Sequence, residues 1–318
     1  MYTLENAVVE FLNHCIYEKN LSPKTIQAYK TDLAQLQKFI ADKNYSSEIT
    51  SVTKTELREY LAFISALKPK SIKRKIAVIK AMFNYLEFED SISVNPVRKM
   101  RIKIKEPVNL PRFLNGGEML EIFKYAYRQT ALKCKSSYSY TASIRDIAVI
   151  ELLFATGARV SEIANLRDPD VNLDSGVITI VGKGSKERII QVCNIDSLSL
   201  LKLYRKLFTG RIAISGGYFL VNRLNKKLSD QSIRTTIRIL SHKALINKHV
   251  TPHFFRHTFA TLLLEKDVDI KYIQSLLGHS SIMTTQIYTH VNKEKQRQIL
   301  KQKHPRKDFI LDNFSYPE

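Results

Sequence analysis

The sequence predicts a mainly helical protein of two domains, with a small β-hairpin or sheet confined to the second domain. Amphipathic helix patterns fill about the first hundred residues, and strand-like runs occur only after residue 170. A length of 318 residues also exceeds the usual span of one hydrophobic core. We therefore expect domains at residues 1–92 and 113–295, joined by a linker at 93–112 and followed by a tail at 296–318.

Four helices are expected in the first domain. The first starts at Thr3 or Glu5 and ends near residue 18, and the second starts at Ser22-Pro23, an N-cap followed by proline at the first helical position. Residues 54–66 and 71–86 carry apolar side chains three or four positions apart. Four helices of this length enclose a small core by themselves.

The linker is predicted where this helical periodicity stops. Asn95-Pro96 is followed by VRKMRIKIKEPVNLPR, in which basic residues accumulate and two prolines break any helix. A basic extended segment is suited to lie along a phosphate backbone, and it is equally typical of a solvated linker.

The second domain is expected to mix helices with one hairpin. Residues 177–181 and 187–192 are strand-like and are joined by GKGSK. Gly278 stands where a helix C-cap is expected. The helices are predicted at residues 144–156, 159–166, 196–207, 230–242, 252–266, 269–277 and 281–291.

Charge and composition indicate the partner and the compartment. The net charge is +20, spread along the chain, and such a field attracts nucleic acid. No apolar run approaches the roughly 18–20 residues of a bilayer span, and the basic residues do not face one continuous apolar stripe, so no membrane partner is expected. The cysteines, Cys15, Cys134 and Cys193, match no metal-ligand spacing and are typical of reduced cytosolic thiols. Glu5 and Glu10 argue against a signal peptide, so we expect a cytoplasmic, nucleoid-associated protein.

Two candidate sites for phosphodiester chemistry precede residue 190. In TGARVSEI, Arg159 and Glu162 lie three positions apart on one helix face, an arrangement that also fits a surface ion pair. In VGKGSKER, Lys183 stands at the hairpin tip between glycines that allow close approach to a backbone, although a lysine in a turn is ordinarily only solubilising.

A third candidate is TPHFFRHTFATLLLE. His253 and Arg256 fall one turn apart near the positive end of a predicted helix, which favours anion binding. His257 lies four residues after His253, but no carboxylate stands between them as in a zinc-binding HExxH helix, so we expect no metal and a packed, hydrogen-bonded His257.

The fourth candidate is LLGHSSIMTTQIYTH. His279 follows the Gly278 break, and Tyr288 follows nine residues later in a predicted short helix. Taken alone, Tyr288 fits a core position better than a nucleophile. The combined order Arg, Lys, His-x-x-Arg, Gly-His, Tyr points to one site, because each group meets a different requirement of phosphodiester cleavage.

Together these segments resemble the catalytic domain of the tyrosine recombinases, the lambda-integrase and Xer family. The helices in LSPKTIQAYKTDLAQLQKF and SIKRKIAVIKAMFNYL, the latter followed by an Asn-Pro pair, are similar to that family's core-binding domain, so the resemblance spans about residues 3–295. Two features depart from the family. Phe255 stands where leucine is more usual, and residues 125–143 are longer than the corresponding interval in compact relatives, with no role assigned.

The resemblance implies a 3′-phosphotyrosine intermediate formed by Tyr288. Two guanidinium groups, those of Arg159 and Arg256, would hold the phosphate oxygens through paired hydrogen bonds. His253 is the candidate for taking the phenol proton and Lys183 the general acid for the leaving 5′ oxygen.

In the same reaction His279 would donate to the phosphate and Glu162 would orient its neighbours. The resemblance implies no metal or other cofactor. The implied partner is double-stranded DNA with inverted-repeat core sites, bound by a homo-tetramer, or by a hetero-tetramer with a related recombinase, that passes through a Holliday junction. Residues expected to contact DNA are Lys24, Thr25, Tyr29, Lys70, Lys73, Arg74, Lys186 and Arg188.

Two other functions remain open from the sequence. A type IB topoisomerase shares the active-site set but rejoins the same strand, and its N-terminal region would not be expected to look like this one. A non-catalytic DNA-binding homologue would lack part of the set, which is intact here. Chromosome dimer resolution and mobile-element integration or excision are both compatible with the sequence.

Overall fold

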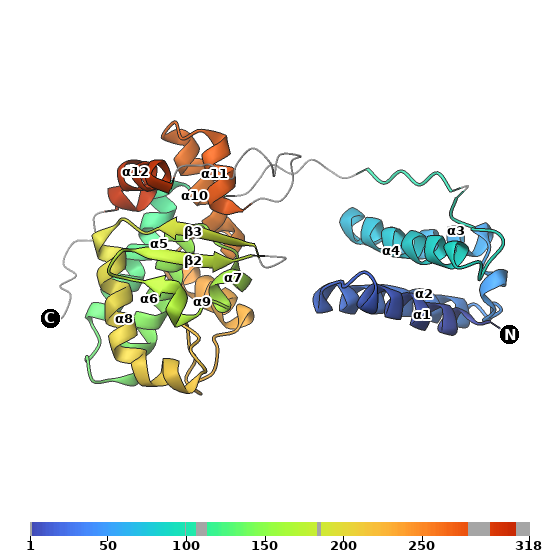
Figure 1. The fold of residues 1–318 in the computed structure, drawn as a ribbon, viewed down its shortest axis with the longest axis horizontal. Coiled ribbons are helices and arrows are strands. Elements are labelled where there is room, and N and C mark those ends of the chain that lie inside the picture. The colour runs from blue at the N-terminus through green and yellow to red at the C-terminus, as the bar shows by residue number, and fades with distance from the viewer. Residues whose placement is uncertain (1, 99, 106–112, 183–185, 279–292, 310–318) are drawn as a thin grey trace. The chain divides into compact units, whose positions relative to one another are not determined.

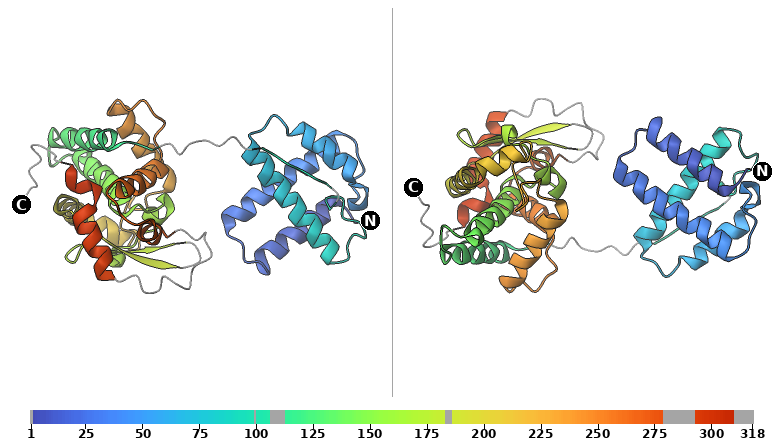
Figure 2. Two further views of the ribbon diagram at one scale, coloured as in Figure 1. Left: turned by 90° about the horizontal axis from the view of Figure 1, so that it is seen from above. Right: turned by 90° about the horizontal axis from the view of Figure 1, so that it is seen from below.

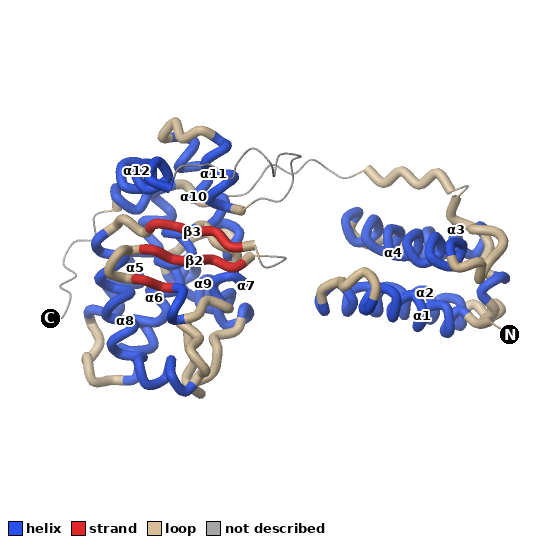
Figure 3. Tube along the Cα trace, in the orientation of Figure 1, coloured by secondary structure: helices blue, strands red, loops and turns tan. Residues whose placement is uncertain are grey.

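The computed structural model describes residues 2–98, 100–105, 113–182, 186–278 and 293–309, and it divides the chain into two units, Met1–Asn109 and Leu110–Glu318 (Figure 1). Each unit has its own hydrophobic core. The protein is mainly helical with one small sheet in the second unit, which confirms the predicted fold class (Figure 3). No helix among these residues is long and apolar enough to cross a bilayer.

The N-terminal unit contains the four expected helices. Its elements are α1 (Leu4–Tyr17), α2 (Pro23–Asp42), the 3-10 turn η1 (Ile49–Ser51), α3 (Lys54–Phe63) and α4 (Pro69–Phe88). The helix starts follow the capping residues: Ser22 accepts a hydrogen bond from the Thr25 N–H, and Thr53 forms a capping box with Glu56. In the two views of Figure 2, α4 crosses the α1–α2 pair.

A buried carboxylate joins two of these helices. Asp32 on α2 is 1% exposed and accepts hydrogen bonds from Lys75 and Arg74 on α4. The core around it is apolar and aromatic, with Phe11, Leu33, Tyr60, Met82 and Phe83 almost completely buried.

The N-terminal unit extends past the predicted boundary at residue 92. Val97 and Met100 are buried in its core, and Ile102 packs against it. The predicted linker therefore begins as part of the first unit. Its apolar residues lie in a non-helical stretch, so periodicity gives no sign of their burial.

The second unit packs helices around α6 and places a three-stranded antiparallel sheet, in the order β1-β2-β3, beside them (Figure 1). Helix α6 is buried along most of its length, against α5, α8 and α10. The elements are α5 (Gly116–Ala131), α6 (Tyr138–Thr156), α7 (Val160–Ala164), η2 (Asp168–Asp170), β1 (Val171–Asn172), β2 (Val177–Val181), β3 (Glu187–Gln191), α8 (Ile195–Ile214), α9 (Asp230–Lys243), α10 (Pro252–Glu265), α11 (Ile270–Leu277), α12 (Lys293–Lys303) and η4 (Pro305–Asp308).

Some boundaries differ from those that the sequence predicts. The hairpin gains a short third strand, β1, which pairs with β2 through Val171 and Ile178. Residues 125–143 comprise the end of α5, a turn and the start of α6. The helix predicted at residues 281–291 lies outside the described residues.

The described part of the segment predicted as a polar tail, residues 296–309, is instead packed into the second unit. Leu300 and Phe309 are buried, and Arg306 is completely buried against Glu151 of α6. The sequence HPRKDF looks solvent-exposed because its charged residues dominate, but the partner of Arg306 is distant in sequence. Such a pair cannot be found from local pattern.

His304 in this segment is neutral and gives unfolding a pH dependence. Its Nδ1 accepts the Arg306 N–H at 3.0 Å, so Nε2 carries the proton and donates to the Ala155 carbonyl at 3.1 Å. Burial lowers the pKa of His304 to about 4. An unfolded histidine titrates near pH 6.5, so the unfolded state alone binds a proton as the pH falls from about 6.5 towards 4, and stability is lost in that window.

We expect the free energy of unfolding to fall by roughly 2 kcal/mol between about pH 7.5 and pH 5 from this group. The comparison is between wild type and His304→Gln, whose amide can still donate to Ala155. Urea midpoints at the two pH values measure the difference. An equal pH dependence in both proteins would contradict a neutral, buried His304.

Candidate active site

Arg159 and Arg256 are brought together at the turn between α6 and α7. Arg159 is the N-cap of α7, and Arg256 projects from α10 to donate to the Gly157 carbonyl at 2.9 Å. Gly157 has a φ of +57°, and a Cβ there would lie 2.6 Å from the Phe259 ring, so the turn requires glycine. The two guanidinium groups are therefore fixed by backbone geometry as well as by side-chain contacts.

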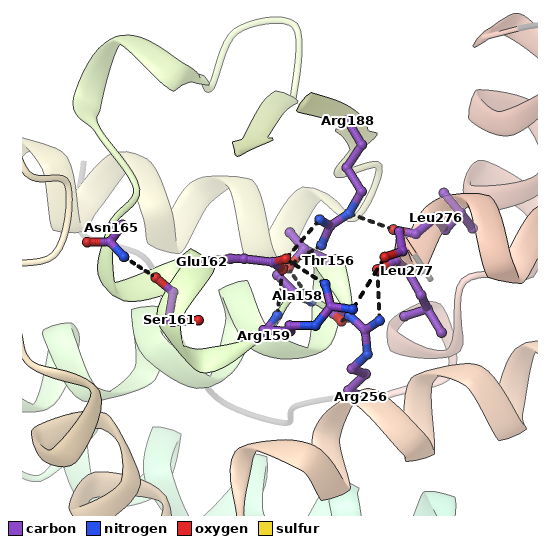
Figure 4. A network of polar contacts seen from close by, with 12 residues as sticks. Thr156, Ala158, Arg159, Ser161, Glu162, Asn165, Arg188, Arg256, Leu276 and Leu277 are labelled. Carbon is purple, nitrogen blue, oxygen red and sulfur yellow. Dashed lines mark hydrogen bonds and ion pairs between the residues drawn. The ribbon is translucent and has the colours of Figure 1, made fainter. Parts of the chain in front are cut away.

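Glu162 links Arg159 to a third arginine, Arg188 of β3 (Figure 4). The Arg159 N–H and Nη1 each donate to the carboxylate at 2.8 Å. Arg188 donates through Nη2 at 2.7 Å and Nη1 at 3.2 Å. Burial raises the pKa of Glu162, but the hydrogen bonds from Arg188 and Arg159 outweigh it and hold the pKa below its usual value.

The end of α11 is held by the same three arginines. Three successive carbonyls each accept from a different one: Leu276 from Arg188 Nε at 2.9 Å, Leu277 from Arg256 Nη2 at 2.8 Å and Gly278 from Arg159 Nη2 at 3.3 Å. Carbonyls in the last turn of a helix lack intrahelical partners, so these bonds satisfy them. They also fix the point from which the chain continues to His279.

Arg256 is buried but keeps donors to spare. Burial, followed by the nearby charge of Arg159, lowers its pKa to about 10, which leaves it charged at neutral pH. A guanidinium has five N–H donors, and two are used on the carbonyls of Gly157 and Leu277. Within the part of the chain that the structure describes, the remaining donors meet no further acceptor, so they can serve an anion.

His253 lies one turn before Arg256 on α10 and is exposed. Desolvation lowers its pKa, and electrostatic interactions with His257, Arg234, Arg256 and Arg159 lower it further. Its imidazole is therefore neutral at physiological pH, the form that accepts a proton.

His257 is exposed rather than packed, which corrects the expectation for this residue. It lies one turn from His253 on the outer side of α10, so the core does not enclose it. No group of three or more metal-ligating side chains lies together within the described part of the chain.

Three members of the predicted catalytic set lie outside the described residues: Lys183, His279 and Tyr288. Of the described members, Arg159, Glu162 and Arg256 meet at the Gly157 turn, and His253 lies one turn before Arg256 on α10. Their chemistry is that of an anion site with a neutral base beside it.

The sequence matches two known protein families. The phage integrase family matches residues 124–295, and the N-terminal SAM-like domain of phage integrases matches residues 8–90. A tyrosine recombinase of Agathobacter rectalis is 45% identical over 97% of this chain and 99% of its own length. The chain belongs to the phage integrase family.

The protein is a site-specific tyrosine recombinase, an enzyme that breaks and rejoins DNA. Tyrosine recombinase XerC of Oceanobacillus iheyensis is 33% identical over 96% of this chain and 98% of its own. Two solved structures share the fold. XerH bound to difH in a pre-cleavage complex has a TM-score of 0.65 at 23% identity, covering 92% of this chain and 83% of its own. A lambda integrase tetramer bound to a Holliday junction has a TM-score of 0.65 at 20% identity, covering 88% and 78%.

The predicted DNA-contacting residues of the recombinase lie on α2, on α4, on β3 and just before β3. Five are exposed: Lys24, Lys70, Lys73, Arg74 and Lys186.

The other three are more enclosed. Thr25 shares a hydrogen bond with Ser22, and Tyr29 stacks on Phe11 with ring centroids 6.1 Å apart. The side chain of Arg188 is only 12% exposed. DNA contact by these residues remains a prediction.

Arg188 has a role in the recombinase site that the sequence analysis missed. A signal for it exists in the alternation of β3, because Arg188 and the fully buried Ile190 are two positions apart and share the inward face. An arginine on that inward face needs a carboxylate partner because its charge is largely removed from water, and Glu162 is this partner.

Proposed function

We propose that the recombinase cleaves DNA by attack of the Tyr288 phenol oxygen on a phosphate held between Arg159 and Arg256. The convergence of these two guanidinium groups at the Gly157 turn carries the proposal. During attack, negative charge develops on the non-bridging oxygens of the phosphate. Two guanidinium groups that are already fixed in place stabilise this charge without moving.

The reaction balances without a metal ion or nucleotide. The bond from the Tyr288 oxygen to phosphorus forms as the bond from phosphorus to the 5′ oxygen breaks. The phenol proton passes to His253, whose lowered pKa keeps it neutral, and the leaving oxygen takes a proton from Lys183. The product is a 3′-phosphotyrosine and a free 5′-hydroxyl.

The roles of Lys183, His279 and Tyr288 rest on the sequence motifs rather than on geometry. His279 adds a donor to the phosphate, and Glu162 holds Arg159 in place. Attack by a 5′-hydroxyl on the phosphotyrosine reverses each step. When that hydroxyl belongs to another duplex, the strands are exchanged.

We further propose that four protomers act on two inverted-repeat core sites and pass through a Holliday junction. The support is the family membership of both domains and the likeness to a lambda integrase tetramer on such a junction. A homo-tetramer and a hetero-tetramer with a related recombinase are both compatible with this support. We propose that the DNA is that of the nucleoid in the cytoplasm and that the reaction serves chromosome dimer resolution or mobile-element integration or excision.

A nicked duplex carrying the target site tests this function. The target is obtained by sequencing the DNA that co-purifies with the cross-linked protein. Loss of the short fragment beyond the cleavage position prevents religation, so we expect a covalent protein–DNA adduct to accumulate. Two matched sites should then yield recombinant products. Relaxation of supercoiled DNA without such products would favour a topoisomerase, and binding without an adduct would indicate a non-catalytic homologue.

A further inference from the structure

Arg188 connects the sheet to two parts of the candidate active site. Its side chain leaves β3 and reaches Glu162 of α7 and the Leu276 carbonyl at the end of α11 (Figure 4). Little space remains around the side chains of Arg188 and Glu162. A Cβ at Gly278 would lie 3.3 Å from both Cδ and Nη1 of Arg188, and one at Gly182 would lie 3.5 Å from Glu162 Oε1.

Glu162 is shared equally between two arginines. An ionised carboxylate offers about four lone-pair positions, and all are used here: two by the Arg159 N–H and Nη1, two by the Nη1 and Nη2 groups of Arg188. The side chain of Arg159 is 35% exposed, whereas that of Arg188 is 12% exposed. Arg188 is the inner partner, and Arg159 is the one that faces outward.

Removing Arg188 would change the hydrogen bonds and the position of the Arg159 side chain. Glu162 is almost completely buried, and it would be left with two unused acceptor positions beside a single guanidinium. A buried carboxylate draws the nearest cation into paired hydrogen bonds, so Arg159 would be pulled inward and its charge neutralised. The Leu276 carbonyl would lose its donor at the same time.

We propose that Arg188 is a positioning residue that satisfies Glu162 and the end of α11, and so keeps the guanidinium of Arg159 facing outward, where its remaining donors can hold the phosphate. It does not contact DNA itself, which replaces the expectation for this residue from the sequence. The inference rests on the proposed function, because it assumes that Arg159 acts on the phosphate.

The first test separates binding from chemistry in Arg188→Met. We expect the affinity for the target site to stay close to wild type, because Arg188 itself contacts no phosphate and the many other contacts along the duplex are kept. The single-turnover cleavage rate at saturating DNA should fall by about 10- to 100-fold, the range typical of losing a residue that orients an active-site group. Arg188→Lys keeps the positive charge but cannot donate to both Glu162 and the Leu276 carbonyl. Its cleavage rate should lie between those of wild type and Arg188→Met.

Lys186→Met is the matched control, since Lys186 is a basic, exposed residue two positions away. Loss of one phosphate contact there should weaken binding and reduce the slope of log affinity against log salt by about 1. The same signature in Arg188→Met, with cleavage at saturating DNA unchanged, would assign Arg188 to the DNA interface and overturn the proposal.

The second test adds Glu162→Gln to Arg188→Met. A neutral amide no longer draws the charge of Arg159, so the double variant should cleave several-fold faster than Arg188→Met alone. A double variant no faster than Arg188→Met would overturn the proposal that Arg188 acts through Glu162. Urea midpoints show which variants fold, and if Arg188→Met does not, Arg188→Lys with and without Glu162→Gln decides the question.

Trapping the wild-type protein on the same nicked DNA separates a failure of the proposed function from a failure of the role proposed for Arg188. Without a wild-type adduct the proposed function fails. With a wild-type adduct and undiminished cleavage by Arg188→Met, the function stands and the role of Arg188 is wrong.

Discussion

Arg256→Lys is expected to lower the single-turnover cleavage rate by about 10²–10³-fold, the usual effect of losing one aimed donor to a developing oxyanion. The substitution keeps a positive charge but removes the planar fork. Arg256 holds the carbonyls of Gly157 and Leu277 while its other donors remain for the phosphate, and an ammonium group has too few donors and the wrong geometry for both tasks.

Affinity for the target site should change little in this variant, because many other contacts hold the duplex. Arg128→Lys, an exposed arginine on α5, is the matched control for the same change outside the site. Cleavage by Arg256→Lys within about threefold of wild type at saturating DNA would contradict the proposed clamp, since it would leave no energetic role for the paired hydrogen bonds.

Arg306→Met is expected to lower the free energy of unfolding of the second unit by about 3–5 kcal/mol, because it leaves the buried carboxylate of Glu151 without its cation. Both side chains are 0% exposed, with Arg306 Nη2 and Glu151 Oε1 2.8 Å apart. Tyr127 and Ser197 also donate to Glu151, at 2.6 Å each, but two hydroxyls do not replace a guanidinium.

Glu151→Gln added to Arg306→Met should restore at least half of the loss, since the unpaired charge is then removed. The control is Arg98→Met, which breaks the pair between an exposed arginine and the half-buried Glu87 and should cost at most about 1 kcal/mol. Urea unfolding followed by circular dichroism measures all three, because the chain has no tryptophan. A loss in Arg306→Met as small as that in Arg98→Met would show that the C-terminal segment is not anchored through Glu151.

The sequence was most informative where local chemistry determines structure. Ser22 and Pro23 marked the start of α2, and Gly278 marked the end of α11, because caps act within a few residues. The His253-x-x-Arg256 spacing likewise placed both side chains one turn apart on α10. The fold class followed from these signals together with the helical periodicity.

Contacts between distant segments could not be predicted in the same way. The bonds from Arg256 to Gly157 and from Arg188 to Glu162 join residues whose spacing carries no pattern. The burial of Arg306 was missed because its carboxylate partner lies on another helix, and β1 was missed because two residues give no alternation. Tertiary packing fixes these features.

The most direct test of the proposed active site is to identify the amino acid that carries DNA after trapping on the nicked target. We expect mass spectrometry of the digested adduct to find a 3′-phosphate joined to Tyr288, with a free 5′-hydroxyl on the released fragment. Tyr288→Phe should bind the same site and give no adduct. DNA attached to any other residue, or an adduct that persists in Tyr288→Phe, would contradict attack by this phenol on a phosphate held by Arg159 and Arg256.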